Sequence, residues 1–268
     1  MKNLLFAFFA AALLFSCNNK ESTKETTETA IAADSGWATS HLKGMVQTFE
    51  EVGYTPDDKG EIGEMDSCCV KISEYNDMGY TMKYTEKDSK GKVTRESIHE
   101  RIDGSKLKSI KRTENGIEVW SRTIHRNDDG KALYAADTDT TGQVNRIHSI
   151  IEENEIGQSL LGKTHTADST YLGTWAFKYI DGMSAGWSWI DSTGTQTIDS
   201  KGELNDKGLL SKMETKSLDN DGNPITTVET YTYESFDDNG NWTQRTKYDG
   251  DAKVVRVEKR TYTYYKGD

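Results

Sequence analysis

Aromatic side chains alternate on both sides of a glycine turn at Gly182, a spacing that could build a binding surface. The rings are Trp175, Phe177, Tyr179, Trp187 and Trp189. Side chains alternate between the two faces of a strand, so this spacing predicts a ladder of rings on one face of a hairpin. Left exposed, such a ladder is a flat platform on which sugar rings stack; buried, it is part of the core. Both interpretations are open from the residues alone.

The next candidates for chemistry are the vicinal thiols Cys68 and Cys69, which together with Cys17 are the three cysteines of the chain. A zinc site of the usual kind needs four ligands with paired spacing, and the sequence has no second cysteine pair. We expect a disulfide between Cys68 and Cys69, with two free core thiols and a redox or metal role as alternatives.

The histidines and the acidic residues give no recognisable catalytic motif. His99, His125 and His148 are 26 and 23 residues apart, which predicts one histidine on every second strand. Such side chains would lie roughly 10 Å from each other, too far apart to share one metal ion. Glu152, Glu153 and Glu155 are acidic neighbours of the kind that glycoside hydrolases use in pairs, but a solvated polar segment explains them better. We expect no catalytic residue, no metal and no cofactor.

The elements that position these residues are predicted by a repeated turn signal. Glycines recur at intervals of 12 to 14 residues through much of the chain. An Asn or Asp stands three residues before glycine at Asn76, Asp88, Asn127, Asp139, Asp191, Asn205, Asp219 and Asp237. The Asx side chain caps a type I turn and the glycine closes it in the left-handed conformation. The sequence therefore predicts an all-β (mostly) protein, an antiparallel β-meander of long repeated hairpins. Whether the sheet is open, a sandwich or a barrel is not fixed by the pattern.

Two segments depart from this rhythm. In the first, hydrophobic residues recur at helical spacing, at Leu42, Met45, Val46, Phe49 and Val52. We therefore expect one short N-terminal amphipathic helix within residues 37–54, packed against the sheet. The second departure is the apolar stretch from Ile150 to Ala167, which interrupts the hairpins and could link two halves.

The chain begins with a processing signal: Lys2, an apolar run from Leu4 to Phe15, and then Cys17. Leu14, Phe15, Ser16 and Cys17 resemble a bacterial lipobox. The resemblance implies that residues 1–17 are a lipoprotein signal peptide ending at a lipidated Cys17, whose acyl chains attach the protein to a membrane. Residues 18–36 are rich in Ser, Thr, Lys and Glu and contain no aromatic side chain. This composition predicts a disordered tether. We expect the domain at 37–268, and a location on the outer membrane, lipid-anchored and with the cell surface as one option.

The charge balance excludes one class of partner. The chain has 33 Lys and Arg against 44 Asp and Glu, a net charge of -11. Binding to phosphate backbones needs a positive surface, so we expect no nucleic acid. The expected membrane contact is the lipid anchor alone.

An internal repeat carries a second resemblance. The quartet Thr230-Tyr231-Thr232-Tyr233 recurs at Thr261-Tyr262-Thr263-Tyr264. These Tyr-rich strands with Asp-x-x-Gly turns resemble the YD or RHS-type repeats, and more loosely the MORN-like hairpin repeats, of secreted and lipid-anchored bacterial proteins. The resemblance implies a β scaffold that carries no catalytic residue.

The function expected from the sequence is a non-enzymatic binding or structural module. Its partner would be a glycan or an envelope protein, held on a sheet face or by strand addition at an open edge. One alternative is an immunity-type protective lipoprotein against a contact-delivered toxin, suggested by the acidic charge and the MORN-like repeats. The other is an envelope hydrolase, which rests only on scattered Asp, Glu and His residues.

Overall fold

A computed structural model describes residues 35–155 and 158–266, the side chains of 67–69 excepted, and all of them belong to one compact unit, Ile31–Asp268. In this part of the chain the structure has one helix, α1 (Gly36–Thr39), and sixteen strands. The strands are β1 (Val46–Pro56), β2 (Ile62–Tyr75), β3 (Thr81–Asp88), β4 (Val93–Ile102), β5 (Lys106–Glu114), β6 (Ile117–Arg126), β7 (Ala132–Thr138), β8 (Val144–Glu153), β9 (Ser159–Thr166), β10 (Tyr171–Ile180), β11 (Met183–Asp191), β12 (Gln196–Leu204), β13 (Leu210–Leu218), β14 (Pro224–Phe236), β15 (Trp242–Tyr248) and β16 (Val254–Tyr264). Among the described residues, no helix is long and apolar enough to cross a membrane.

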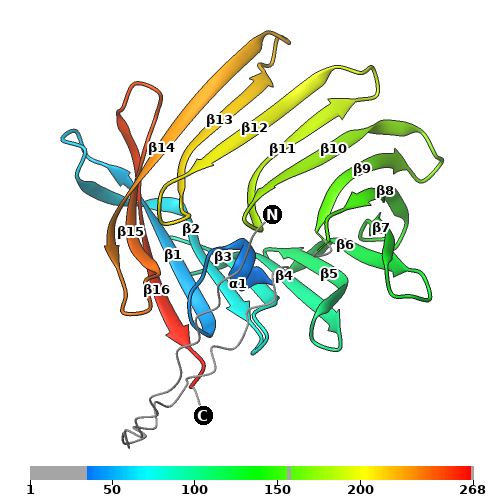
Figure 1. The fold of residues 1–268 in the computed structure, drawn as a ribbon, viewed down its shortest axis with the longest axis horizontal. Helices are drawn as coiled ribbons and strands as arrows, with labels where there is room; N and C mark the ends of the chain where they lie inside the picture. Colours follow the sequence, from blue (N-terminus) through cyan, green and yellow to red (C-terminus); the bar gives the residue numbers. More distant parts are fainter. Residues whose placement is uncertain (1–34, 156–157, 267–268) are drawn as a thin grey trace, which may run out of the picture. The chain divides into compact units, whose positions relative to one another are not determined.

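The strands form a closed antiparallel barrel in which each strand pairs with its neighbours in sequence (Figure 1). The all-β antiparallel prediction is confirmed. Closure, which the turn pattern left open, comes from the pairing of β1 with β16, where Phe49 lies opposite Tyr262 and Glu51 opposite Arg260. The expectation of an open sheet edge for strand addition is therefore wrong, because the two end strands, β1 and β16, pair with each other.

The predicted turns are present. At the β3–β4 turn, Gly91 donates its N–H to the carbonyl of Asp88, and the side chain of Asp88 accepts from the backbone of Lys90 and Lys92 at 2.9 Å each. Gly91 has φ +81°, the left-handed region that glycine enters at little cost. This side-chain cap explains why an Asx residue recurs three positions before the glycine.

The predicted amphipathic helix is wrong. Helix α1 has four residues, and most of the segment expected to be helical belongs to β1. A β-bulge between Val46 and Thr48 inserts one residue, so that Val46 and Phe49 share one face of the strand. Because of the bulge, two residues three positions apart share one face of a strand, a spacing that is otherwise typical of a helix. The stretch from Ile150 to Ala167 is not an interruption either, since β8 and β9 pair like the other neighbours.

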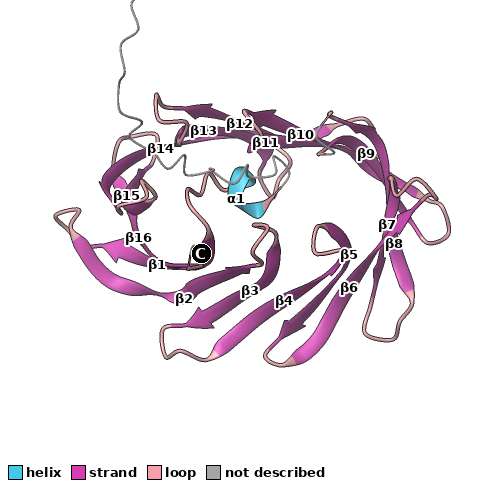
Figure 2. Ribbon diagram, turned by 60° about the horizontal axis from the view of Figure 1, so that its bottom comes forward, coloured by secondary structure: helices cyan, strands magenta, loops and turns pink. Residues whose placement is uncertain are grey.

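The main buried cluster lies where α1 meets the first strands. Its members are Trp37, Leu42, Val46, Phe49 and Tyr75. The indole of Trp37 donates to the carbonyl of Val46 at 2.7 Å, which fixes α1 to β1. Figure 2 shows α1 inside the ring of strands. Part of the lumen is therefore filled by the chain's own apolar side chains.

Beside this cluster, ion pairs on the luminal face join the two ends of the sheet. Glu51 on β1 accepts from Arg260 on β16 at 2.8 Å and also faces Lys71 on β2 at 3.7 Å. The guanidinium of Arg260 lies 3.9 Å from the ring centre of Trp242. On the same face Glu258 pairs with Arg245. Buried charges of opposite sign thus stabilise the strand pair that closes the barrel.

The outer face carries pairs of opposite charge between neighbouring strands. Along β10 and β11, the residues between the lumen-facing rings point outward, and Lys178 on this face pairs with Asp199 on β12. Lys212 pairs with Glu203 at 3.2 Å across β13 and β12. Charged groups therefore stand within the strands on the outside of the barrel.

Candidate ligand-binding cavity

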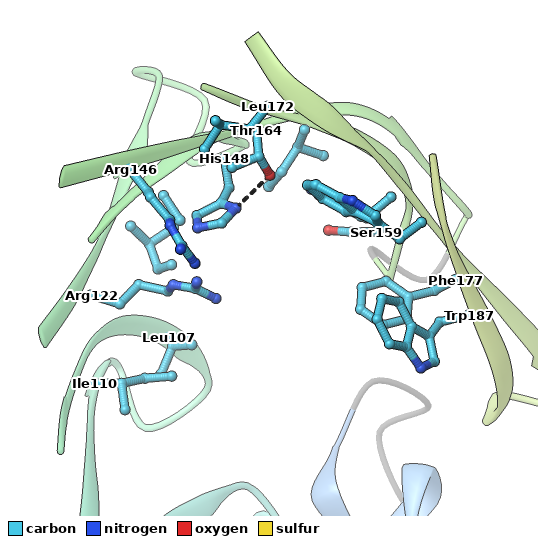
Figure 3. A pocket seen from close by; sticks show the side chains of 15 residues that line it. Leu107, Ile110, Arg122, Arg146, His148, Ser159, Thr164, Leu172, Phe177 and Trp187 are labelled. Carbon is cyan, nitrogen blue, oxygen red and sulfur yellow. Dashed lines mark hydrogen bonds between the residues drawn. The ribbon is translucent and has the colours of Figure 1, made fainter. Parts of the chain in front are cut away.

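A cavity of about 660 Å³ lies on the luminal side of β5 to β11 (Figure 3). It is lined by Leu107, Ile110, Arg122, Ile124, Ala135, Arg146, His148, Ile150, Ser159, Thr164, Leu172, Trp175, Phe177, Trp187 and Trp189. This volume lies in the range of about 300–1,000 Å³ that small-molecule sites occupy.

One wall is made by the aromatic ladder that the sequence predicts. Trp175 lies opposite Trp189 and Phe177 opposite Trp187 in the β10–β11 pair, and the rings of Trp175 and Phe177 are 5.3 Å apart. Phe177 is 39% exposed and Trp187 38%, whereas Trp37 in the core is 3% exposed. The rings at the cavity are therefore accessible, as a binding platform requires and a core does not.

Tyr179, the fifth predicted ring, continues the ladder but does not line the cavity. It lies opposite Ser184, with its ring 6.4 Å from that of Phe177. Burial raises the pKa of its hydroxyl. Tyr179 extends the packed row of rings beyond the cavity.

Two glycines hold the indoles flat against the barrel wall. A Cβ on Gly162, the β9 partner of Trp175, would come within 2.0 Å of the Cζ2 atom of that indole. A Cβ on Gly173 would come within 2.5 Å of the Cζ2 atom of Trp189. An aromatic ring that covers a glycine shields its backbone and takes a defined orientation. Each indole thus presents its other face to the cavity. These two glycines were not predicted as part of the site. The signal for them in the sequence is that they fall inside predicted strands rather than at turns.

The opposite wall contains a hydrogen-bonded group of polar residues. Asp137 on β7 accepts from Arg122 Nε at 2.6 Å and from Arg122 Nη2 at 2.9 Å, and its Oδ2 lies 2.9 Å from His148 Nε2. His148 Nδ1 lies 2.9 Å from the hydroxyl of Thr164. Burial raises the pKa of the Asp137 carboxyl, but the hydrogen bonds from Arg122 and His148 outweigh burial and hold that pKa well below its usual value. Asp137 is thus ionised and neutralises Arg122.

Arg146 differs from its neighbours on this wall. It lies on β8 opposite Asp137, and its guanidinium points into the cavity near that of Arg122 (Figure 3). Yet within residues 35–155 and 158–266 it forms no ion pair and no hydrogen bond through its side chain. The wall therefore offers one cation that a ligand can reach.

The chain Thr164–His148–Asp137 has the order of a nucleophile, a base and an orienting carboxylate. Thr164, however, is 2% exposed. With Thr164 largely buried, the chain of hydrogen bonds fixes the orientation of His148 and Arg122.

The other predicted site residues are placed as follows. Cys17 lies outside the described residues. Cys68 and Cys69 lie in β2, but their side chains are outside the described part, so the disulfide stays a prediction.

The three spaced histidines stand on alternate strands as predicted, His99 on β4, His125 on β6 and His148 on β8. His125 stacks on Tyr134 with ring centres 4.3 Å apart, away from the cavity. No group of three His, Cys, Asp or Glu side chains in the described part of the chain is arranged to hold a metal ion. Glu153 lies 3.7 Å from Lys131, and neither it nor Glu152 lines the cavity.

No family model and no curated protein matches this sequence. Among solved structures, a porin-like protein from Bacteroides uniformis ATCC 8492 is similar with a TM-score of 0.53 at 13% identity, over 86% of this chain and 100% of that chain. A porin-like protein from Bacteroides vulgatus ATCC 8482 matches with a TM-score of 0.33 at 10% identity, over 82% of this chain and 98% of that chain. At such identities, the first similarity supports the barrel fold alone.

Proposed function

We propose that this protein is a lipid-anchored envelope barrel that binds a small organic ligand in its lumen and catalyses no reaction. The observation that carries the proposal is the aromatic wall: Trp175, Phe177, Trp187 and Trp189 border a cavity, and two of these rings are more than a third exposed. Large exposed apolar surface inside a concave site is costly in water unless a ligand covers it.

The outer face supports a barrel that stands in water. A barrel that spans a bilayer presents an apolar band to the lipid, and a Lys at mid-membrane costs about 2–4 kcal/mol. Here Lys178 and Asp199, and likewise Lys212 and Glu203, form ion pairs on the outside. Lys201 and Glu214 lie opposite each other on the same face, near the middle of β12 and β13. The proposed membrane contact is therefore the acyl group on Cys17, not the barrel wall.

The ligand is proposed to be apolar on both sides of its body. A glycan, one of the partners expected from the sequence, would stack one face of each ring on the indoles and offer hydroxyls to polar groups. The wall opposite the indoles, however, carries Ile110, Ile124 and Ile150 beside its polar group, and in that group Arg122, His148 and Thr164 are already hydrogen-bonded. An aromatic wall that faces aliphatic side chains suits hydrocarbon better than a hydroxyl-rich ring.

The binding proposal is tested with N-phenyl-1-naphthylamine, a neutral fluorophore that brightens in apolar surroundings. The protein is the mature chain without its lipid, residues 18–268, which contains the compact unit Ile31–Asp268. We expect saturable binding, seen as energy transfer from tryptophan to the fluorophore. Trp187→Ala should weaken the binding. Trp120→Ala, which removes a luminal ring outside the cavity lining, should not. Absence of saturable binding, or equal binding by both variants, would overturn the proposal.

The anchor is tested separately, by membrane fractionation of cells that produce the whole chain or its Cys17→Ala variant. We expect the wild-type protein in the membrane fraction, in a form labelled by a palmitate analogue. An unlabelled wild-type chain would contradict the lipid anchor but leave the cavity proposal intact. The protective-lipoprotein and hydrolase alternatives stay predictions.

A further inference from the structure

The charges around the cavity do not cancel. Arg122 is bound by Asp137 through two hydrogen bonds, and both ring nitrogens of His148 are hydrogen-bonded. Arg146 has no such partner among the described residues, and none of the residues that line the cavity is an Asp or a Glu. One positive charge thus faces the cavity, in a chain whose net charge is -11.

This cation is placed to bind an anion without a large desolvation cost. Arg146 is exposed to solvent, so its charge is accessible to a ligand. The planar guanidinium donates two parallel N–H bonds to a carboxylate, a geometry that an ammonium group does not offer. Arg122, which Asp137 already holds, cannot take this role without losing its partner.

The rest of the lining defines the body of the ligand. Six aliphatic side chains and four aromatic rings line the cavity: Leu107, Ile110, Ile124, Ala135, Ile150, Leu172, Trp175, Phe177, Trp187 and Trp189. Hydroxyl groups come only from Ser159 and Thr164 among the lining residues, and Thr164 is already bonded to His148. A ligand with polar groups along its whole length would leave them without partners. The complementary molecule is polar at one end and hydrocarbon elsewhere.

We propose that the cavity binds a hydrocarbon carboxylic acid, with the carboxylate on the guanidinium of Arg146 and the chain or ring between the indoles and the aliphatic wall. The proposal rests on the proposed function, since it names the ligand class of the same cavity. Arg146 acts as the residue that selects an acid over a neutral molecule of the same shape.

The test is displacement of bound N-phenyl-1-naphthylamine by three molecules of equal chain length, used below their micelle concentrations. These are dodecanoate, dodecanol and dodecyltrimethylammonium. A hydrogen bond to a charged group contributes about 1.5–3 kcal/mol, so we expect dodecanoate to displace the fluorophore at a concentration about tenfold or more below that of dodecanol. The ammonium compound is expected to be the weakest.

Two variants with the same charge change separate a local contact from net charge. Arg146→Gln removes the cavity cation, and Lys201→Gln removes an exposed outer-face cation opposite Glu214 on β13. We expect Arg146→Gln to abolish the advantage of dodecanoate over dodecanol, each measured against fluorophore bound to the same variant, and Lys201→Gln to keep that advantage. Circular dichroism and urea unfolding of both variants show that they are folded.

The outcomes distinguish the two proposals. Equal displacement by dodecanoate and dodecanol in the wild type overturns the carboxylate inference but leaves a luminal binding module. Loss of the advantage in both variants would also overturn it, because the effect would then come from overall charge. If tri-galacturonic acid displaces the fluorophore and dodecanoate does not, the proposed hydrocarbon body of the ligand is overturned and an acidic glycan is the better candidate. Failure of the fluorophore to bind the wild type overturns the proposed function itself.

Discussion

The indole of Trp175 covers Gly162 across the β9–β10 pair, so closely that a Cβ on Gly162 would lie 2.0 Å from the Cζ2 atom of the ring. The same Cβ would lie 2.5 Å from the carbonyl oxygen of Ser149 on β8. The orientation of the platform ring thus depends on a missing side chain in the neighbouring strand.

This relationship predicts that Gly162→Ala displaces the indole toward the cavity. We expect weaker N-phenyl-1-naphthylamine binding and a loss of about 1–3 kcal/mol in unfolding free energy, typical of an overpacked site. Fluorescence titration and urea unfolding measure the two effects. Gly250→Ala is the control, because the nearest atom to its added Cβ, Val228 Cβ, is 3.8 Å away. Wild-type binding by Gly162→Ala would show that the ring position does not matter.

Two tryptophans with different exposure should separate binding from stability. Trp37→Ala removes a ring that is 3% exposed, and we expect it to lower the unfolding free energy by about 3–5 kcal/mol. Trp187→Ala removes a ring that is 38% exposed, and we expect a much smaller change, on the order of 1 kcal/mol, with loss of fluorophore binding. Thermal unfolding followed by circular dichroism gives the comparison. If Trp187→Ala destabilises as much as Trp37→Ala, the ladder is core and not a platform.

The buried carboxylate at the barrel closure predicts a loss of stability in acid. Burial raises the pKa of Glu51, but Arg260, Arg245 and Lys71 outweigh it and hold that pKa below the ordinary value of 4.5. Since the folded state has the lower pKa, the stabilisation is complete above the unfolded value and is lost as the pH falls through the folded one. The unfolding free energy should therefore drop as the pH falls below about 4.5.

The variant that checks this assignment is Glu51→Gln. It leaves Arg260 without its partner, so we expect a loss of about 3–5 kcal/mol at neutral pH and a smaller drop in acid than in the wild type. Glu50→Gln changes the adjacent, outward-facing carboxylate and should stay within about 0.5 kcal/mol of the wild type. Urea unfolding at several pH values is the measurement. An acid response in Glu51→Gln as steep as that of the wild type would assign the effect to other carboxylates.

The hydrogen-bonded chain through His148 also gives a test of the hydrolase alternative. Because the hydroxyl of Thr164 is buried, we expect hydrolysis of p-nitrophenyl butyrate by the wild type to equal that of His148→Gln. His125→Gln, on the outer face, controls for nonspecific imidazole reactivity. Hydrolysis that only His148→Gln abolishes would restore the enzyme hypothesis.

Local features were predictable where one short segment carries the whole signal. The cap of Asp88 on Lys90 and Lys92 lies within one turn, and so the turn pattern predicted the hairpins and their order. The alternation of Trp175 and Phe177 likewise predicted a shared face. The false helix arose because the bulge at Val46 and Thr48 shifts the register, which depends on the partner strand β16.

The features that were missed join residues far apart in the chain. Closure pairs Glu51 with Arg260, and no local pattern reports that pairing. The cavity brings Leu107 and Arg146 to face Trp187, and only the curvature of the barrel sets those strands opposite each other. Asp137 lies directly opposite Arg146 in the neighbouring strand, but its carboxylate is bound to Arg122. The absence of an ion pair at Arg146 therefore depends on these neighbouring side chains and not on its own sequence position.

The most direct test of the account is a crystal structure of the mature chain with dodecanoate. The account predicts density in the lumen, with the carboxylate within hydrogen-bonding distance of the Arg146 guanidinium and the hydrocarbon chain against Trp187 and the aliphatic wall. Dodecanoate bound only on the outer face or at the hairpin turns, with the lumen holding water alone, would contradict it.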